Sequence, residues 1–189
     1  GDLLFALTLK HFGISKKMTF EFSGMVSDQT PLKFQELDNQ QINICDNNDK
    51  VYLTAQRSGG NTNQRELINH FIQAYVGFSG QTFPHVLVPL MKAKGVMINP
   101  DRPLVIYNSM SLELDDLAMH QPSLELENSG LTVSGKRGDV CLSFNFIDAG
   151  KVVGHGEKNM VLSSLRDYDD EKIAQLVNTY NHRKETITE

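Results

Sequence analysis

The sequence predicts an α+β fold in which antiparallel strands surround central helices, with one arrangement used twice along the chain. Two observations lead to this prediction: an apolar helix precedes each group of strands, and the strands alternate apolar and polar residues with a period of two. A chain of 189 residues can form one domain or two small ones of about 90 residues. We expect a first unit over residues 1–62, a second over residues 63–168 and a C-terminal helix over residues 169–189.

The first unit begins with a helix over residues 2–12, which contains four leucines and which Gly13 ends. A strand over residues 18–22 follows, with its apolar side chains on one face. The polar, glycine-containing segment over residues 57–63 is expected to link the two units. Three shorter strands are predicted between that first strand and this linker, over residues 32–37, 41–45 and 51–56.

The second unit repeats the same order. A helix over residues 64–75 is followed by a second, apolar helix over residues 84–94, with Pro84 in its first turn, where the missing amide hydrogen costs no hydrogen bond. In the strand predicted over residues 123–134 the apolar residues change parity near Gly130, which indicates a bulge. The other strands of this unit are predicted over residues 104–114, 140–147 and 151–163.

The composition argues against several classes of function. A net charge of −5 gives no positive field that would attract a phosphate backbone, so nucleic acid is not an expected partner. No apolar run is as long as the roughly 18 residues of a membrane span, so no membrane contact is expected. Cys45 and Cys141 lie far apart, without a histidine or cysteine at metal-ligand spacing. This pattern predicts buried, reduced thiols in a cytoplasmic protein that holds neither a metal nor a cofactor.

One segment carries most of the functional information. Residues 78–85 read Phe-Ser-Gly-Gln-Thr-Phe-Pro-His and lie between the two predicted helices of the second unit. This segment resembles the signature Ser-Gly-Asp-Phe-Asn-Pro-Ile-His of MaoC-like hydratases, which belong to the hotdog superfamily. Gln81 stands where that signature has its aspartate, and one residue fewer separates this position from His85. The segment therefore looks like a degenerate copy, in which the acid–base pair is incomplete.

The resemblance implies a site for an acyl thioester, carried by coenzyme A or by a carrier protein. In that family the acid and the histidine activate water, and amides at a helix N-terminus hold the thioester oxygen. His85 and Gln81 are thus the catalytic candidates, and a helix-start or capping role is the alternative for both. The residues expected to contact the ligand are Ser79, Gly80, Thr82, Phe83, Pro84, Val86 and His155, the last of which is otherwise an ordinary histidine on a sheet surface.

The same resemblance implies a tandem, or double, hotdog fold, in which each helix is wrapped by an antiparallel sheet. Residues 95–107 also resemble a family of uncharacterised bacterial proteins, from which no activity follows. Three functions remain open: an acyl-thioester-binding protein with a degenerate hydratase site, an active hydratase or thioesterase whose acid–base pair lies upstream of residue 1, and a non-catalytic structural or dimerisation module. A homodimer is a possible assembly.

Overall fold

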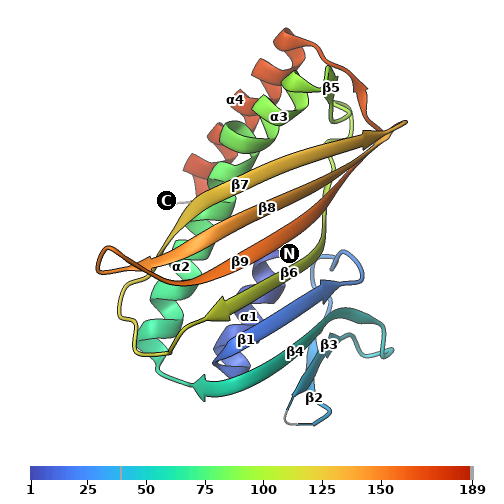
Figure 1. The fold of residues 1–189 in the computed structure, drawn as a ribbon. Helices are drawn as coiled ribbons and strands as arrows, with labels where there is room; N and C mark the ends of the chain where they lie inside the picture. The colour runs from blue at the N-terminus through green and yellow to red at the C-terminus, as the bar shows by residue number, and fades with distance from the viewer. Residues whose placement is uncertain (39, 188–189) are drawn as a thin grey trace.

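The computed structural model of the chain describes residues 1–38 and 40–187 and has a mixed α+β architecture (Figure 1). Its main feature is an eight-stranded sheet with the strand order β2-β3-β4-β1-β6-β9-β8-β7 in the described part of the chain. Every pairing given for these strands is antiparallel. The predicted α+β class with an antiparallel sheet is therefore confirmed.

The first half consists of one helix and four strands. The helix α1 (Asp2–Phe12) has the predicted bounds, and Gly13 takes a positive φ of 81° between it and β1. The predicted linker over residues 57–63 is wrong, because residues 57–62 continue β4 and Ser58 pairs with Lys17 of β1. Backbone groups make the ladder hydrogen bonds, so polar residues with exposed side chains can extend a strand. The strands of this half are β1 (Ile14–Phe22), β2 (Lys33–Glu36), β3 (Gln41–Cys45) and β4 (Val51–Thr62).

A nearly continuous helical segment opens the second half. It comprises α2 (Arg65–Thr82), a π-helical turn η1 (Phe83–Leu87) and α3 (Val88–Ala93). The predicted break between residues 75 and 84 is wrong. A proline inside an α-helix lacks one donor and crowds the carbonyl four residues earlier. In the wider π turn the amide of Val88 donates to the carbonyl of Phe83, which accommodates the prolines without ending the helix.

Four long strands follow this helical segment: β6 (Val105–Leu114), β7 (Ser123–Ser134), β8 (Arg137–Asp148) and β9 (Lys151–Ser163). The bulge predicted at Gly130 is misplaced. Gly130 pairs regularly with Cys141, and the shift of register between β7 and β8 lies between Leu126 and Asn128. Two short strands, β5 (Val96–Met97) and β10 (Arg166–Asp167), pair with each other before the final helix α4 (Asp170–Ile187).

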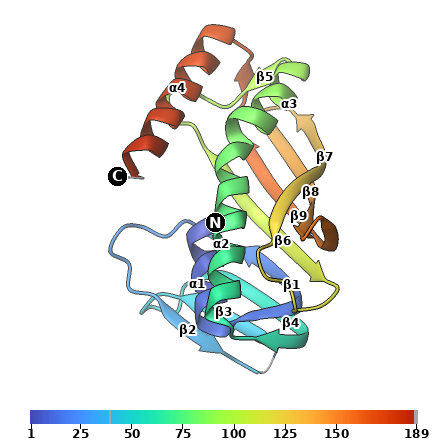
Figure 2. The same cartoon turned by 90° about the vertical axis from the view of Figure 1, so that its left-hand side faces the viewer.

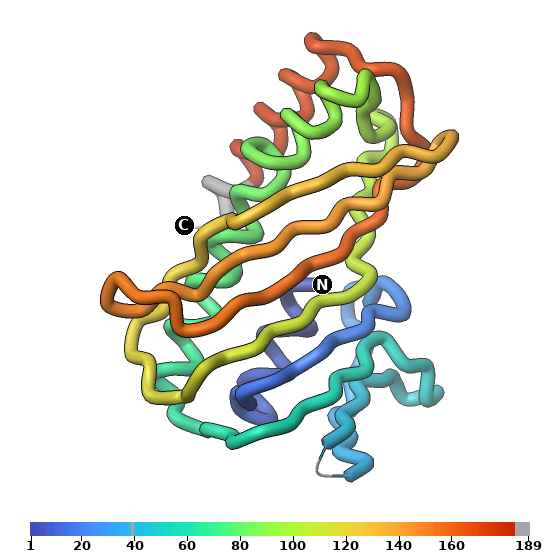
Figure 3. The backbone as a smooth tube through the Cα atoms, in the orientation of Figure 1, coloured from blue at the N-terminus to red at the C-terminus, as the bar shows by residue number. Residues whose placement is uncertain are grey.

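The two halves repeat one topology. In each half the first strand lies at the centre of the sheet and pairs with the fourth, while the second strand lies at the outer edge. The central strands β1 and β6 join the halves, with Met18 opposite Leu112. Figure 2 shows α1 and α2 on the same side of the sheet, and Figure 3 shows the strands of both halves as one continuous surface.

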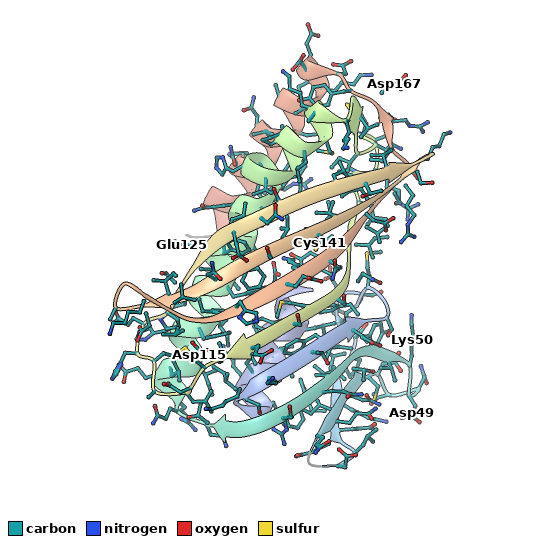
Figure 4. All side chains as sticks on the ribbon, in the orientation of Figure 1. Asp49, Lys50, Asp115, Glu125, Cys141 and Asp167 are labelled. Carbon is teal, nitrogen blue, oxygen red and sulfur yellow. The ribbon has the colours of Figure 1, made fainter. Side chains whose placement is uncertain are left out.

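The buried apolar residues form two clusters between the sheet and the helices. The first surrounds α1 and α2, where the rings of Phe5 and Phe20 meet edge to face. The second joins η1, α3, β8 and β9 to α4, through residues such as Met91 and Ile173. Both cysteines are free, but Cys141 is exposed on β8, contrary to the prediction that both thiols are buried (Figure 4). Among residues 1–38 and 40–187, no helix combines the length and apolar character that crossing a membrane requires.

Candidate functional site

The most unusual residue of the described chain is a buried lysine, Lys158, whose relative exposure is 1%. It lies on β9, where burial alternates, and it shares the inner face of the sheet with Gly156 and Met160. Gly156 packs beside Phe144 of the first apolar cluster, and Met160 belongs to the second. The lysine therefore places a charged group at the boundary between two apolar cores.

Three side chains from other elements surround the ammonium group of Lys158. Its Nζ donates to Ser79 Oγ of α2 at 2.9 Å and to Tyr107 Oη of β6 at 2.7 Å. A carboxylate oxygen of Asp2, in the first turn of α1, lies 3.7 Å from the same nitrogen. Ser79 Oγ in turn donates to the other Asp2 oxygen at 2.8 Å and lies 2.8 Å from Tyr107 Oη. We call Asp2, Ser79, Tyr107 and Lys158 the Lys158 cluster.

Burial shifts the proton affinities within this cluster. Loss of hydration lowers the pKa of Lys158 to about 8, and the nearby Asp2 carboxylate offsets part of that change. Burial also raises the pKa of Tyr107 far above its ordinary value, with a further contribution from the Asp2 charge. Tyr107 is therefore protonated at neutral pH, and its hydrogen is donated to Ser79, because the serine hydrogen is used on Asp2. The lysine hydrogen that Tyr107 accepts strengthens it as a donor.

Ser79 holds the cluster together rather than serving as a nucleophile. Its hydroxyl donates to Asp2 and lies within hydrogen-bond distance of both Lys158 and Tyr107. A serine oxygen has one hydrogen and two lone pairs, so these three partners occupy its full capacity. Unused hydrogen-bonding capacity is found on other side chains. Among the described residues, Asp2 Oδ1, which lies 3.7 Å from Lys158 Nζ, and the hydroxyl of Tyr75 are buried without a hydrogen-bond partner.

We expect Tyr75→Phe to raise the free energy of unfolding by about 1 kcal/mol, because it removes a buried hydroxyl that has no partner in the described structure. Urea unfolding of the two proteins measures the difference. Tyr107→Phe is the matched control, and it should destabilise the protein because that hydroxyl interacts with both Lys158 and Ser79. A loss of stability in Tyr75→Phe would contradict this assignment and point to a hydrogen bond from that hydroxyl to the Asp2 carboxylate. Burial, together with the charge of that carboxylate, raises the pKa of Tyr75.

A cavity of about 650 Å³ opens beside the cluster, a size typical of small-molecule sites. We call it the α4 cavity, because the final helix forms one of its walls. The hydroxyl of Tyr180 on that helix donates to the carbonyl of Gly80 at 3.0 Å, which ties α4 to α2. The residues that line the cavity are Asp2, Ser79, Thr82, Phe83, Leu87, Ile98, Pro100, Asp101, Pro103, Val105, Tyr107, Met160, Leu176, Thr179, Tyr180 and Arg183.

The predicted motif divides between two faces of one helix. Ser79, Thr82 and Phe83 line the α4 cavity, whereas the predicted catalytic residues Gln81 and His85 are exposed. At 3.6 residues per turn, positions 81 and 85 lie opposite positions 79 and 83. The predicted helix start at Pro84 is wrong, because helix precedes and follows this residue, so the segment cannot offer the unpaired amides of a helix N-terminus.

The other predicted ligand contacts lie outside the cavity lining. Pro84 and Val86 are half-buried in η1, and the carbonyl of Gly80 accepts the hydrogen bond from Tyr180. His155 is exposed on the outer face of β9, where its Nε2 lies 4.0 Å from a carboxylate oxygen of Glu113. The alternation that places His155 outside places Lys158 inside, on the parity of Met160 and Leu162. That parity was readable in the sequence and would have identified the lysine.

No metal centre is found in the part of the chain that the structure describes. There, no group of three or more histidine, cysteine, aspartate or glutamate side chains lies close enough to hold an ion.

Two solved structures match the chain over most of its length at low sequence identity. The tesB protein of Mycobacterium avium subs paratuberculosis is 10% identical, with a TM-score of 0.50, and the match covers 85% of each chain. The acyl-CoA thioesterase II TesB2 from Mycobacterium marinum is 9% identical, with a TM-score of 0.48, over 89% of this chain and 90% of the other. No curated protein matches the sequence. A family model described as "Protein of unknown function (DUF3581)" matches residues 1–171.

Proposed function

The chain belongs to this family of unknown function, and we propose from the site itself that it binds an acyl thioester in the α4 cavity, next to the Lys158 cluster. One observation carries the proposal: a cavity of ligand size, with apolar side chains over about half of its lining, borders a buried group of polar side chains. A thioester has the same division, with apolar arms on both sides of one polar carbonyl. Small-molecule sites commonly pair an apolar lining with a few fixed polar groups.

Tyr107 is the group that would hold the thioester carbonyl. Its hydroxyl is protonated because burial raises its pKa, and Lys158 donates to its oxygen at 2.7 Å. For a carbonyl in the cavity to accept the tyrosine hydrogen, the hydroxyl has to turn from Ser79 to the carbonyl, with the lysine charge immediately behind it. Hydrogen bonds that involve a charged group contribute more than neutral ones, and a low-dielectric surrounding strengthens them further. Asp2 and Ser79 keep the lysine and the tyrosine in place.

Calorimetric titration with a non-hydrolysable thioether analogue of an acyl-coenzyme A tests the proposal. We expect Tyr107→Phe to weaken binding about tenfold, since it removes one hydrogen bond assisted by a charge. His85→Ala and Gln81→Ala are matched controls on the exposed face of the helix, and they should bind like the wild type. Neither heat nor a thermal shift with the wild type at millimolar analogue would overturn the proposal and favour a structural or dimerisation module.

Hydrolysis of the bound thioester is the second candidate function. The observation that favours it is the Asp2 carboxylate, which borders the cavity and has one oxygen without a hydrogen-bond partner among the described residues. A carboxylate in this position can accept a proton from a water molecule that attacks the carbonyl. Release of free thiol from acyl-coenzyme A, and its loss in Asp2→Asn, measures this activity. The alternative of an acid–base pair upstream of residue 1 would leave Asp2→Asn active.

We also propose that each half of the chain is one hotdog unit, so that the whole is a tandem hotdog. The support is the repeated order of a helix and four strands, with β1 and β6 paired at the centre. Four features stay predictions: the division at residue 62, the relation to MaoC-like hydratases, the homodimer and the cytoplasmic location. Since Gln81 and His85 are exposed, we place no hydratase chemistry on those two side chains.

A further inference from the structure

The Lys158 cluster borders a second cavity, on the side of α1. This α1 cavity has a volume of about 610 Å³ and shares three lining residues, Asp2, Val105 and Tyr107, with the α4 cavity. Asp2 and Tyr107 therefore form part of the wall between the two spaces. These residues are not part of the buried core. All three shared residues are only half-buried, and the relative exposure of the Asp2 side chain is 34%.

The two cavities differ in chemistry. Apart from Asp2 and Tyr107, the side chains that line the α1 cavity are apolar, and two of them, Leu3 and Met25, are each 65% exposed. The α4 cavity adds hydroxyl and charged groups from three elements, among them Thr82, Thr179 and Tyr180. Exposed apolar side chains gathered around a cavity are the usual mark of an apolar ligand, whereas amides and hydroxyls of a ligand need polar partners.

We propose that an acyl thioester spans both cavities, with its hydrocarbon chain in the α1 cavity and its amide-bearing thiol arm in the α4 cavity. This inference rests on the proposed function and adds the direction in which the ligand lies. The thioester group then sits at the shared wall, where Tyr107 and Asp2 face both spaces. The arrangement matches the ligand's own order of groups: an apolar chain, one carbonyl, and an arm rich in amides.

The dependence of affinity on chain length tests the direction. Thioether analogues of acyl-coenzyme A with two to ten carbons in the acyl-like chain are titrated calorimetrically against the wild type. Each methylene that leaves water strengthens binding by up to about fourfold, so the Kd should fall with chain length until the α1 cavity is full. The two-carbon analogue reports on the thiol arm alone.

Met25→Asp introduces a charge at the α1 cavity, at a side chain exposed enough to be replaced without disturbing the core. We expect the two-carbon analogue to keep its wild-type Kd within about twofold and the eight-carbon analogue to bind at least about tenfold more weakly, because the new carboxylate would lose hydration beside the chain. Val152→Asp is the matched control, since Val152 is an apolar residue on β9 that is 56% exposed and lines neither cavity. It should leave the whole series unchanged.

A wild-type dependence on chain length that survives Met25→Asp overturns the inference. Thr179→Trp, which fills the α4 cavity, then identifies the alternative, because it would abolish the dependence if the hydrocarbon lies there instead. Equal affinity for all analogues also overturns the inference and leaves the proposed function intact. If the wild type binds none of them, the proposed function and the inference both fail.

Discussion

Gly154→Ala should lower the free energy of unfolding by about 3 kcal/mol, the upper part of the range for overpacked interiors. A Cβ at this position would lie 2.5 Å from the carbonyl oxygen of Glu113 and 3.0 Å from the Cα of Leu114, both in the backbone of β6. These atoms cannot rotate away as a side chain can. The two strands would have to separate where Gly154 pairs with Leu114. Lys158 lies on the same strand as Gly154 and pairs with Met110 of β6.

Thermal unfolding measures this effect, and for a chain of this size about 3 kcal/mol corresponds to a fall in Tm of roughly 6–12 °C. Gly130→Ala is the matched control in the same sheet, because an added Cβ there meets no atom within 4 Å. That variant should stay within about 0.5 kcal/mol of the wild type. Equal Tm values for the two variants would show that the sheet adjusts at Gly154, contrary to the expected rigidity of the β6 backbone.

Lys158→Met should change the pH dependence of stability. In the folded protein the pKa of Lys158 is about 8, against 10.5 for an unperturbed lysine, so between these values the unfolded chain binds more protons than the folded one. Stability of the wild type therefore rises with pH in this window and loses that gain as the pH falls through 8. Across the whole window between the two pKa values, this gain in the free energy of unfolding amounts to roughly 3 kcal/mol, because each tenfold change in proton affinity contributes about 1.4 kcal/mol.

Urea unfolding at pH 7, 8, 9 and 10 measures the effect as the stability of the wild type minus that of Lys158→Met. We expect this difference to rise steadily with pH, with most of the roughly 3 kcal/mol reached by pH 10. Lys151→Met is the matched control, since Lys151 lies on the same strand with an exposed side chain. Its difference from the wild type should stay small at every pH. A flat difference for Lys158→Met would mean that the lysine keeps an ordinary proton affinity in the folded state.

The position of Lys158 also shows what the periodicity of a strand can predict. Alternation along residues 151–163 predicted the strand, and the parity of Met160 and Leu162 places Lys158 on the inner face. The same parity puts His155, an expected ligand contact, on the outer face. The glycines on either side of it, Gly154 and Gly156, allow β6 and β9 to pack where a Cβ would collide with neighbouring atoms.

The residues predicted from the motif over residues 78–85 lie on two faces of one helix. Ser79, Thr82 and Phe83 line the α4 cavity, whereas Gln81 and His85, the predicted catalytic pair, are exposed. The sequence did not predict this division, because a loop was expected between two helices. A π turn accommodates the prolines, so the helix continues and its period of 3.6 residues decides which side chains face the cavity.

The sequence by itself determined the class of the fold, the helix over residues 2–12, the antiparallel strands and the order of elements that repeats. These features depend on local patterns, because a period of two or 3.6 residues decides which face of an element is apolar. Only the tertiary structure decided the site. Asp2, Ser79, Tyr107 and Lys158 come from α1, α2, β6 and β9, and it is the pairing of β6 with β9 and the packing of both helices on the sheet that bring their polar atoms within 4 Å. No local pattern records such an arrangement, because it depends on which distant elements exclude water together.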